Sequence, residues 1–102
     1  MKKTNEQNRL IIIGAGAAGR SLMKSIEKTD YQFLGFLDDF LTGPNIIGQL
    51  KDVNEVIDKY GVTDLFFSIP SANASLVRKF INQIKNKYVH IAILPRTLNI
   101  IK

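Results

Sequence analysis

The sequence contains no cysteine and a single histidine, His90. The lack of cysteine excludes disulfides, thiolate catalysis and thiolate metal sites. One histidine cannot form a metal cluster, and His90 stands in a run typical of a strand, so we interpret it as a buried or edge residue without a special role. No apolar stretch approaches the roughly 20 residues that span a bilayer, and no export signal follows the N-terminal lysines. These absences predict a cytoplasmic domain with no metal site and no membrane contact from this segment.

Common catalytic patterns are missing as well. Short-chain dehydrogenases and sugar-nucleotide epimerases use a Tyr-x-x-x-Lys pair, but the three tyrosines here are followed four positions later by Gly35, Asp64 and Ala92. No Ser/His/Asp set stands out either. The net charge of +5 is moderate, its basic residues are scattered, and the aromatics fall mostly inside apolar runs, which argues against nucleic-acid binding. The chain alone is therefore predicted to bind or position a ligand without catalysing a reaction.

What the sequence does contain is a regular alternation of short apolar runs and amphipathic stretches. Asp52 and Gly61 are the expected N-cap and C-terminal stop of the middle helix. The pattern predicts an α/β fold, a single Rossmann-like three-layer domain with helices on both faces of a parallel sheet of about five strands in the order 3-2-1-4-5. Residues 1–8 are the predicted flexible lead-in and 9–102 the domain. The predicted strands are 10–13, 32–37, a very short 46–47, 65–69 and 89–94, and the predicted helices lie near 18–26, 53–60 and 76–84.

A glycine motif follows the first predicted strand and opens the first predicted helix. In this context Gly14 turns the chain out of the strand, Gly16 keeps the backbone clear for a pyrophosphate, and Gly19 lets the helix pack closely on the sheet. Free N–H groups at the helix N-terminus would stabilise phosphate oxygens. The predicted cofactor-binding segment comprises Gly14, Ala15, Gly16, Ala17, Ala18, Gly19 and Arg20.

Two acids end the second predicted strand. Asp38 lies 19 positions after Gly19, where a Rossmann domain carries the acid that accepts hydrogen bonds from the adenosine ribose. Such an acid repels a 2′-phosphate, so NAD is favoured over NADP. Asp39 is the neighbouring candidate for the same role. The structural alternative is a strand-to-loop turn that carries two solvated acids.

A third segment, Ile69-Pro70-Ser71, ends the strand that borders the same crevice. Pro70 stops the strand, and Ser71 or Asn73 can cap the following helix. The same groups would face a ligand across the switch point of the sheet, so ligand binding and simple capping both stay open. For Arg20, too, two interpretations stay open: its side chain binds a phosphate, or it points into water.

Four segments together resemble one group of bacterial enzymes: residues 10–20, 35–39 (Gly-Phe-Leu-Asp-Asp), 69–72 (Ile-Pro-Ser-Ala) and 93–95 (Ile-Leu-Pro). From about Arg9 to Ile101 the chain resembles the N-terminal nucleotide-binding domain of nucleoside-diphosphate-sugar 4,6-dehydratases and epimerases of capsular-polysaccharide and lipopolysaccharide synthesis. In that family a catalytic domain with its own dinucleotide site and the tyrosine-lysine pair follows, and many members have membrane helices in front.

The resemblance implies that the chain is a fragment or stand-alone relative of an NAD-dependent enzyme of surface polysaccharide synthesis. The parent would act on UDP- or similar sugars, with some members anchored on the cytoplasmic face. The ligand of the domain would be NAD, coenzyme A or a UDP-sugar, and its partner would be the downstream catalytic domain, with a homo-oligomer possible. By position, the family singles out Gly14, Gly16, Gly19, Asp38 and Ser71.

The chain is also similar to the sugar-binding domain of bacterial sugar-nucleotide acyltransferases, which pair a glycine loop with a Phe-Leu-Asp-Asp-like strand end. Those proteins typically carry Gly-Gly-His-Gly where this chain has residues 16–19, Gly-Ala-Ala-Gly. Two further hypotheses stay open. One is a regulatory module that senses nucleotide or redox state, and the other is a degenerate Rossmann fold used only for dimerisation.

Overall fold

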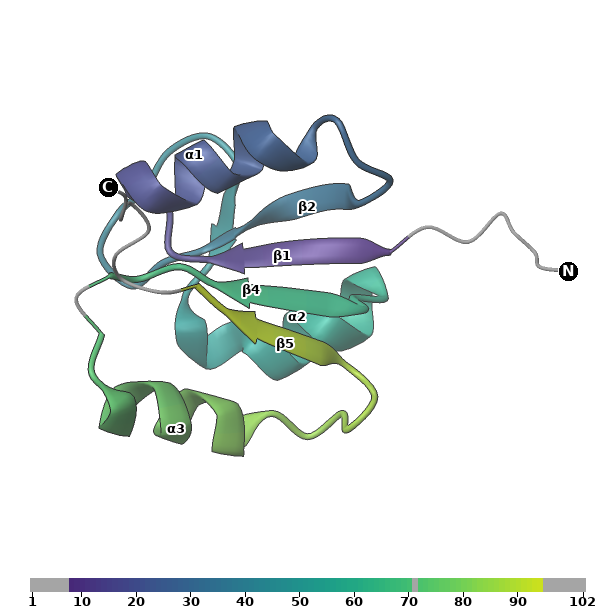
Figure 1. Cartoon of the computed structure of the whole chain (residues 1–102). Helices are drawn as coiled ribbons and strands as arrows, with labels where there is room; N and C mark the ends of the chain where they lie inside the picture. The colour runs from purple at the N-terminus through teal and green to yellow at the C-terminus, as the bar shows by residue number, and fades with distance from the viewer. Residues whose placement is uncertain (1–7, 71, 95–102) are drawn as a thin grey trace, which may run out of the picture.

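The computed structural model describes residues 8–70 and 72–94. Ser71, most of the predicted lead-in (1–7) and the segment 95–102 with the predicted strand stop Pro95 lie outside the described residues. Strands and helices alternate along the chain, as the sequence predicts (Figure 1). The elements are β1 (Arg9–Ile13), α1 (Ala17–Ile26), β2 (Gln32–Leu37), β3 (Ile46–Gly48), the 3-10 helix η1 (Leu50–Asp52), α2 (Val53–Tyr60), β4 (Asp64–Phe67), α3 (Ala74–Gln83) and β5 (His90–Ile93).

The five strands form one parallel sheet in the order β3-β2-β1-β4-β5. This confirms the predicted Rossmann-like topology. At the end of the central strand, Ile13 pairs with Leu37 on one side and with Phe67 on the other. Because all strands run in the same direction, their carboxyl ends gather along one edge of the sheet, on the left in Figure 1.

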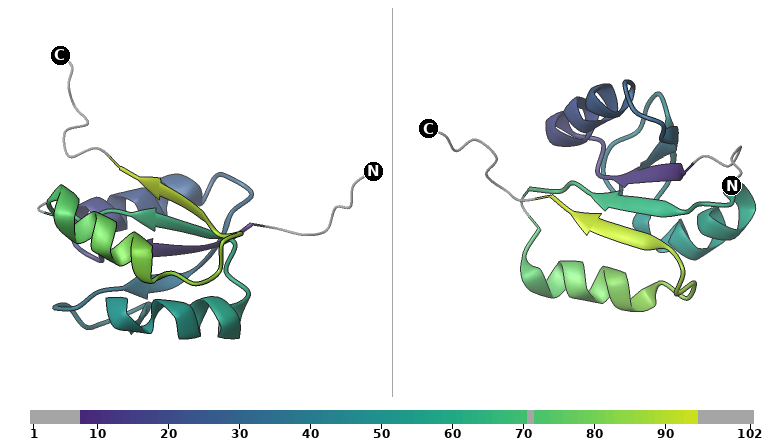
Figure 2. Two further views of the ribbon diagram at one scale, coloured as in Figure 1. Left: turned by 90° about the horizontal axis from the view of Figure 1, so that it is seen from below. Right: turned by 45° about the vertical axis from the view of Figure 1, so that its right-hand side comes forward.

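Helices cover both faces of the sheet (Figure 2). Leu10 and Ile12 of β1 pack in one core cluster with Ile26 of α1. Ile11 and Ile13 point the opposite way, into a cluster that includes residues of α2 and α3. These four apolar residues of β1 are completely buried, because a central parallel strand is covered on both faces. This explains why the run 10–13 is continuously apolar and does not alternate with polar residues.

The helix ends follow local sequence signals with one difference. Gly61 ends α2 in the left-handed conformation, as predicted, with φ of 64°, and Asn73 caps α3 by accepting a hydrogen bond from the Leu76 N–H at 2.8 Å. Asp52 stands at the N-cap position of α2, but its side chain makes no capping bond to that helix. Its Oδ2 instead accepts a hydrogen bond from the Gln49 N–H at 2.9 Å, because η1 precedes α2 directly.

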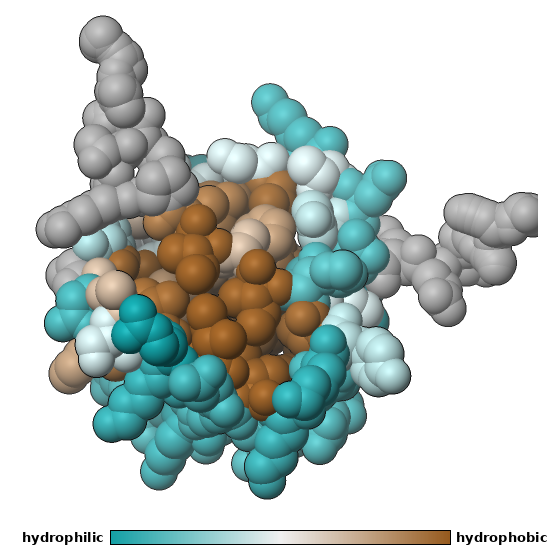
Figure 3. All heavy atoms as spheres, turned by 60° about the horizontal axis from the view of Figure 1, so that its bottom comes forward, coloured by the Kyte–Doolittle hydropathy of each residue, from teal (hydrophilic) through white to brown (hydrophobic). Residues whose placement is uncertain are grey.

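The side of the molecule that carries α2 and α3 has apolar side chains gathered at its centre and hydrophilic ones around them (Figure 3). A cavity of about 530 Å³ lies between α3 and β5, with Val77, Ile81 and Ile93 among its lining residues. β5 is an edge strand, and His90 at its start is exposed, in line with the edge interpretation of this histidine. Over residues 8–70 and 72–94, no helix has the length and apolar character needed to cross a membrane.

The glycines of the motif hold α1 against the sheet. Gly14 has φ of +106°, and a Cβ at this residue would lie 2.5 Å from the Ser68 carbonyl oxygen on β4's continuation. A Cβ at Gly19 would lie 1.9 Å from the Gly14 carbonyl oxygen, which is backbone and cannot rotate away. Gly19 therefore sets the distance between α1 and the turn that follows β1, as the sequence predicts.

We expect Gly19→Ala to destabilise the domain by about 1–3 kcal/mol or more, because the methyl group overlaps a backbone oxygen. Urea unfolding followed by circular dichroism measures this. Gly16→Ala is the control, because a Cβ at Gly16 meets nothing within 4 Å, and it should cost no more than about 1 kcal/mol as a change of N-cap residue. Equal stability of Gly19→Ala and the wild type would contradict the packing argument.

Candidate functional site

A cavity of about 320 Å³ lies at the carboxyl edge of the sheet, next to the ends of β1, β2 and β4. The chain leaves β1 for α1 on one face of the sheet and leaves β4 for α3 on the other, so the cavity stands at the topological switch point where open α/β sheets bind ligands. Its size is at the lower end of ligand pockets, which measure about 300–1,000 Å³. The lining residues are Gly16, Asp38, Asp39, Phe40, Leu50, Ser68, Ile69, Pro70, Ala72 and Leu76.

The structure brings five of the sequence-predicted site residues together around this cavity. They come from the glycine loop, the end of β2 and the segment after β4. The other predicted residues support it: Gly14 and Gly19 shape the loop, and Ala17 and Ala18 form the start of α1. Ser71 lies outside the described residues. The five that line the cavity are Gly16, Asp38, Asp39, Ile69 and Pro70.

Gly16 brings the start of α1 to the cavity. It is the N-cap of this ten-residue helix, no side chain caps the helix there, and its first turn carries no acid. The first N–H groups of a helix have no partner within the helix and carry partial positive charge. Nothing lies within 4 Å of the position of a Gly16 Cβ, so the space beside the N-cap is open. The geometry suits a phosphate or another anion.

Asp38 is held by the backbone of two loops. Its Oδ2 accepts a hydrogen bond from the Ala15 N–H at 2.8 Å, and its Oδ1 accepts from Phe40 and Leu41, each at 2.8 Å. Burial acts to raise the pKa of this carboxyl group, but the three N–H donors outweigh it and hold the pKa below its usual value. A carboxylate has about four acceptor sites. Three of those of Asp38 accept hydrogen bonds from the protein itself, so few are left for the ribose that the sequence analysis expected there.

Asp39 and Arg20 also have partners in the fold. Asp39 is exposed, and its Oδ1 accepts a hydrogen bond from the Leu50 N–H at the start of η1, at 2.9 Å. Arg20 donates from Nε to the Ala15 carbonyl at 3.3 Å and from a terminal nitrogen to the Pro44 carbonyl at 3.2 Å. Its guanidinium also lies 4.7 Å from the centre of the Phe36 ring. Arg20 thus links the glycine loop to the β2–β3 connection, a role that the sequence did not indicate.

Ser68 is a cavity residue that the sequence analysis missed. It follows β4 directly, is only 5% exposed, and its Oγ has no hydrogen-bond partner among the described residues. A buried hydroxyl without a partner is destabilising in a folded chain. The available signal was a lone hydroxyl in the apolar run 65–69, next to the expected switch point. The Ser68 backbone lies against Gly14, and Ser68 lines the cavity together with Gly16.

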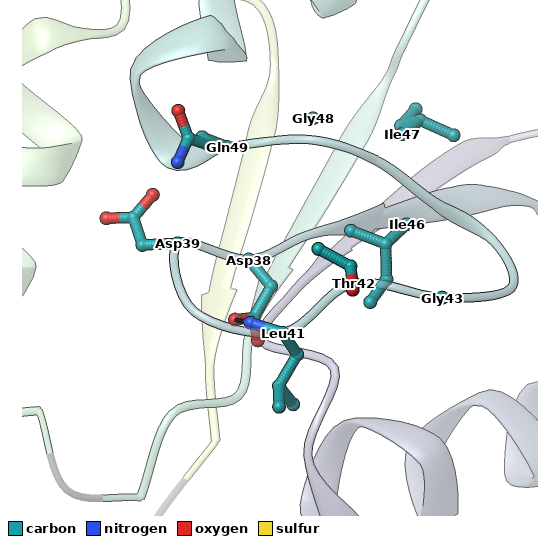
Figure 4. A pocket seen from close by; sticks show the side chains of 9 residues that line it. All are labelled: Asp38, Asp39, Leu41, Thr42, Gly43, Ile46, Ile47, Gly48 and Gln49. Atoms are coloured by element: carbon teal, nitrogen blue, oxygen red, sulfur yellow. Dashed lines mark hydrogen bonds between the residues drawn. The ribbon is translucent and has the colours of Figure 1, made fainter.

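A second cavity of about 370 Å³ lies along the β2–β3 connection and shares Asp38 and Asp39 with the first. Figure 4 shows the two acid side chains pointing apart, Asp38 toward Leu41 and Asp39 toward the side where Gln49 lies. The two acids therefore separate two neighbouring spaces at the carboxyl edge of the sheet. No cluster of three or more potential metal ligands occurs in the part of the chain that the structure describes.

The hydrogen bonds to Asp38 predict a pH-dependent contribution to stability. Because the folded pKa is lowered, the contribution is fully present above about 3.9, the pKa of an unfolded aspartate, and is lost as the pH falls through the folded pKa. Asp38→Asn should cost about 1–3 kcal/mol of unfolding free energy near neutral pH. In urea titrations the difference in unfolding free energy between the variant and the wild type should become smaller as the pH falls toward about 3. A difference that does not change with pH would show that the Asp38 carboxylate does not make this contribution.

Solved structures share this fold. A UDP-D-quinovosamine 4-dehydrogenase from Vibrio fischeri matches with a TM-score of 0.70 at 20% identity, over 88% of this chain and 80% of that one. An engineered D-amino acid dehydrogenase bound to NADP+ gives 0.65 at 22%, over 86% of this chain and 27% of that one. RSP, a Rex-family repressor, matches with a TM-score of 0.63 at 18% identity, over 89% of this chain and 54% of that one. The chain thus spans about a quarter of the length of the D-amino acid dehydrogenase and about half of the length of the repressor.

Among curated proteins, none matches the chain. The model of one protein family, the PglD N-terminal domain, matches residues 9–93. The match begins at the first residue of β1 and ends at the last residue of β5, so it covers the whole sheet and the three α-helices. The chain therefore belongs to the PglD N-terminal domain family.

Proposed function

We propose that this domain binds a nucleoside-diphosphate sugar, with the diphosphate at the N-terminus of α1. The observation that carries the proposal is the pairing, in one cavity, of Gly16 at the N-terminus of α1 with Ser68, whose buried hydroxyl has no hydrogen-bond partner among the described residues. A ligand oxygen would satisfy this hydroxyl and the free N–H groups of α1 together. Hydrogen bonds to a charged phosphate are worth more than those to a neutral group, so a diphosphate suits this set of donors.

Family membership supports the sugar-nucleotide part of the ligand. The PglD N-terminal domain family agrees with the acyltransferase alternative raised by the Phe-Leu-Asp-Asp strand end. The structural neighbour from Vibrio fischeri is a UDP-D-quinovosamine 4-dehydrogenase, whose name also points to a UDP-sugar. The two parent enzymes considered from the sequence, acyltransferase and dehydratase or epimerase, both handle nucleotide sugars. A nucleotide sugar is therefore the ligand class that these lines of support share.

The domain would recognise the nucleotide sugar and present it to a catalytic domain elsewhere in a cytoplasmic parent protein. In this proposal Gly16 and Ser68 take part in binding, and the catalytic groups belong to the other domain. A parent that acts in surface polysaccharide synthesis, as a dehydratase, an epimerase or an acyltransferase, is part of this proposal. The alternatives are a regulatory module and a fold used only for dimerisation. A domain used only for dimerisation would bind no ligand, so a binding measurement distinguishes it from the proposal.

NAD is the second candidate ligand. The second cavity along the β2–β3 connection favours it, because a dinucleotide has two nucleoside halves and would use spaces on both sides of the Asp38–Asp39 turn. Ribose recognition by Asp38, as expected from the sequence, would have to share a carboxylate that already accepts three hydrogen bonds. Asp39, with one oxygen bound to Leu50, is the more open of the two acids.

A first test compares ligands by thermal unfolding of the domain with UDP-N-acetylglucosamine, NAD, NADP and coenzyme A. At 100 times its dissociation constant a ligand stabilises by about 2.7 kcal/mol, which shifts the midpoint by roughly 10 °C or more in a domain of this size. We expect a shift with the UDP-sugar and its loss in Gly16→Val, whose side chain would occupy the open space before α1. A shift with NAD alone would favour the second candidate, and no shift would favour dimerisation only.

A second test uses the unpartnered hydroxyl. Ser68→Ala should leave the unfolding free energy unchanged or raise it, because it removes a buried polar group without a partner. The same change should weaken UDP-sugar binding by about 10-fold to 150-fold, the loss of one hydrogen bond to a charged group. Calorimetric titration measures the affinity. Ser25→Ala, on the exposed side of α1, is the matched control, and equal affinities of both variants and the wild type would remove Ser68 from the site.

A further inference from the structure

One aromatic side chain beside the cavity is left in water by a backbone that is firmly held. The Phe40 side chain is 93% exposed, so it contributes little to the core. Its N–H donates to Asp38 Oδ1 at 2.8 Å, and the Leu41 N–H donates to the same oxygen. The backbone that carries this exposed aromatic residue is thus held in place. Burial of such a ring on ligand binding would be favourable, since apolar area is removed from water.

The cavity that Phe40 lines has two chemically different parts. Its polar part consists of Gly16, which brings the N-terminus of α1 to the cavity, Ser68 with its buried hydroxyl, and the two acids Asp38 and Asp39. Phe40 and Leu76, which is 43% exposed, are apolar groups that come from the β2–β3 connection and from α3. A nucleotide has the same two parts, a charged phosphate group and a flat aromatic base. The N-terminus of α1 suits the first, and the apolar part of the cavity suits the second.

Resting on the proposed nucleotide-sugar function, we propose that the Phe40 ring stacks on the nucleobase of the ligand. The diphosphate then lies at Gly16 and Ser68, and the base lies between Phe40 and Leu76. Stacking is tolerant of base identity because every base has a π-face. Phe40 accordingly raises affinity for nucleotides as a class and discriminates them from sugar phosphates, which have no base.

Asp38 fixes the spacing between the two contact points. Its Oδ2 holds the Ala15 N–H of the glycine loop and its Oδ1 holds the Phe40 N–H, each at 2.8 Å. The backbone that carries the phosphate site and the backbone that carries the ring are therefore tied to one carboxylate. In this arrangement Asp38 is a positioning residue, which acts on the ligand through the loops that it joins.

The experiment measures calorimetric affinities of the whole chain for UDP, which has a base, and for inorganic diphosphate, which has none. Phe40→Ala should weaken UDP binding by about 5-fold to 150-fold, the range measured for base–aromatic stacking, and leave diphosphate binding unchanged. Phe40→Trp should restore UDP binding. Tyr88→Ala is the matched control, because Tyr88 is 91% exposed and lies outside the residues that line the cavity.

A direct contact measurement accompanies the titrations. In NMR spectra of the complex with UDP, we expect intermolecular NOEs between the Phe40 ring protons and the uracil protons. Their absence in a saturated complex would overturn the inference, as would equal affinities of Phe40→Ala and the wild type for UDP. An equal loss for UDP and inorganic diphosphate would also overturn it, because it would make Phe40 a loop-supporting residue. Failure of the wild type to bind either ligand would refute the proposed function itself.

Discussion

The carboxylate of Asp38 is the contact on which the geometry of the carboxyl edge depends. Three backbone N–H groups from two separate loops converge on its two oxygens. Without this anion, the glycine loop and the start of the β2–β3 connection would lose one of the two charged side chains that join them, and each would leave polar groups to be satisfied by water. Arg20 acts in the same direction, since it joins the Ala15 and Pro44 carbonyls. Two side chains of opposite charge therefore hold the N–H and the C=O of a single residue, Ala15.

Packing places the start of α1 as strictly as these polar contacts do. The Gly19 backbone approaches the Gly14 carbonyl so closely that no side chain fits between them. The two apolar clusters on either face of β1 then fix the orientation of the helices relative to the sheet. Gly16 at the start of α1, Phe40 and Ser68 consequently line one cavity although they come from three distant stretches of the chain.

Much of this architecture was predictable from the sequence because it rests on local signals. The apolar run 10–13, the glycine spacing and the alternation of strand and helix patterns were sufficient for the parallel sheet and its strand order. The partners of Asp38 were not predictable, because the path of the β2–β3 connection decides whether its oxygens face backbone N–H groups or solvent. The unsatisfied state of Ser68 depends on every neighbour in three dimensions. The exposure of Phe40 was not predictable either, because an aromatic residue after two acids is equally compatible with the core and with the surface.

The three glycines of the motif are required for different reasons, so substitutions at them have different consequences. Gly14 and Gly19 are demanded by backbone geometry and close packing, so selection for a folded domain alone retains them. Gly16 has open space around it, and the fold favours glycine there only as the N-cap of α1, an effect of about 1 kcal/mol or less. A lineage that abandons its ligand is thus free to change the middle glycine while the outer two persist. The middle position is therefore the one at which the proposed ligand, more than the fold, would limit the size of the side chain.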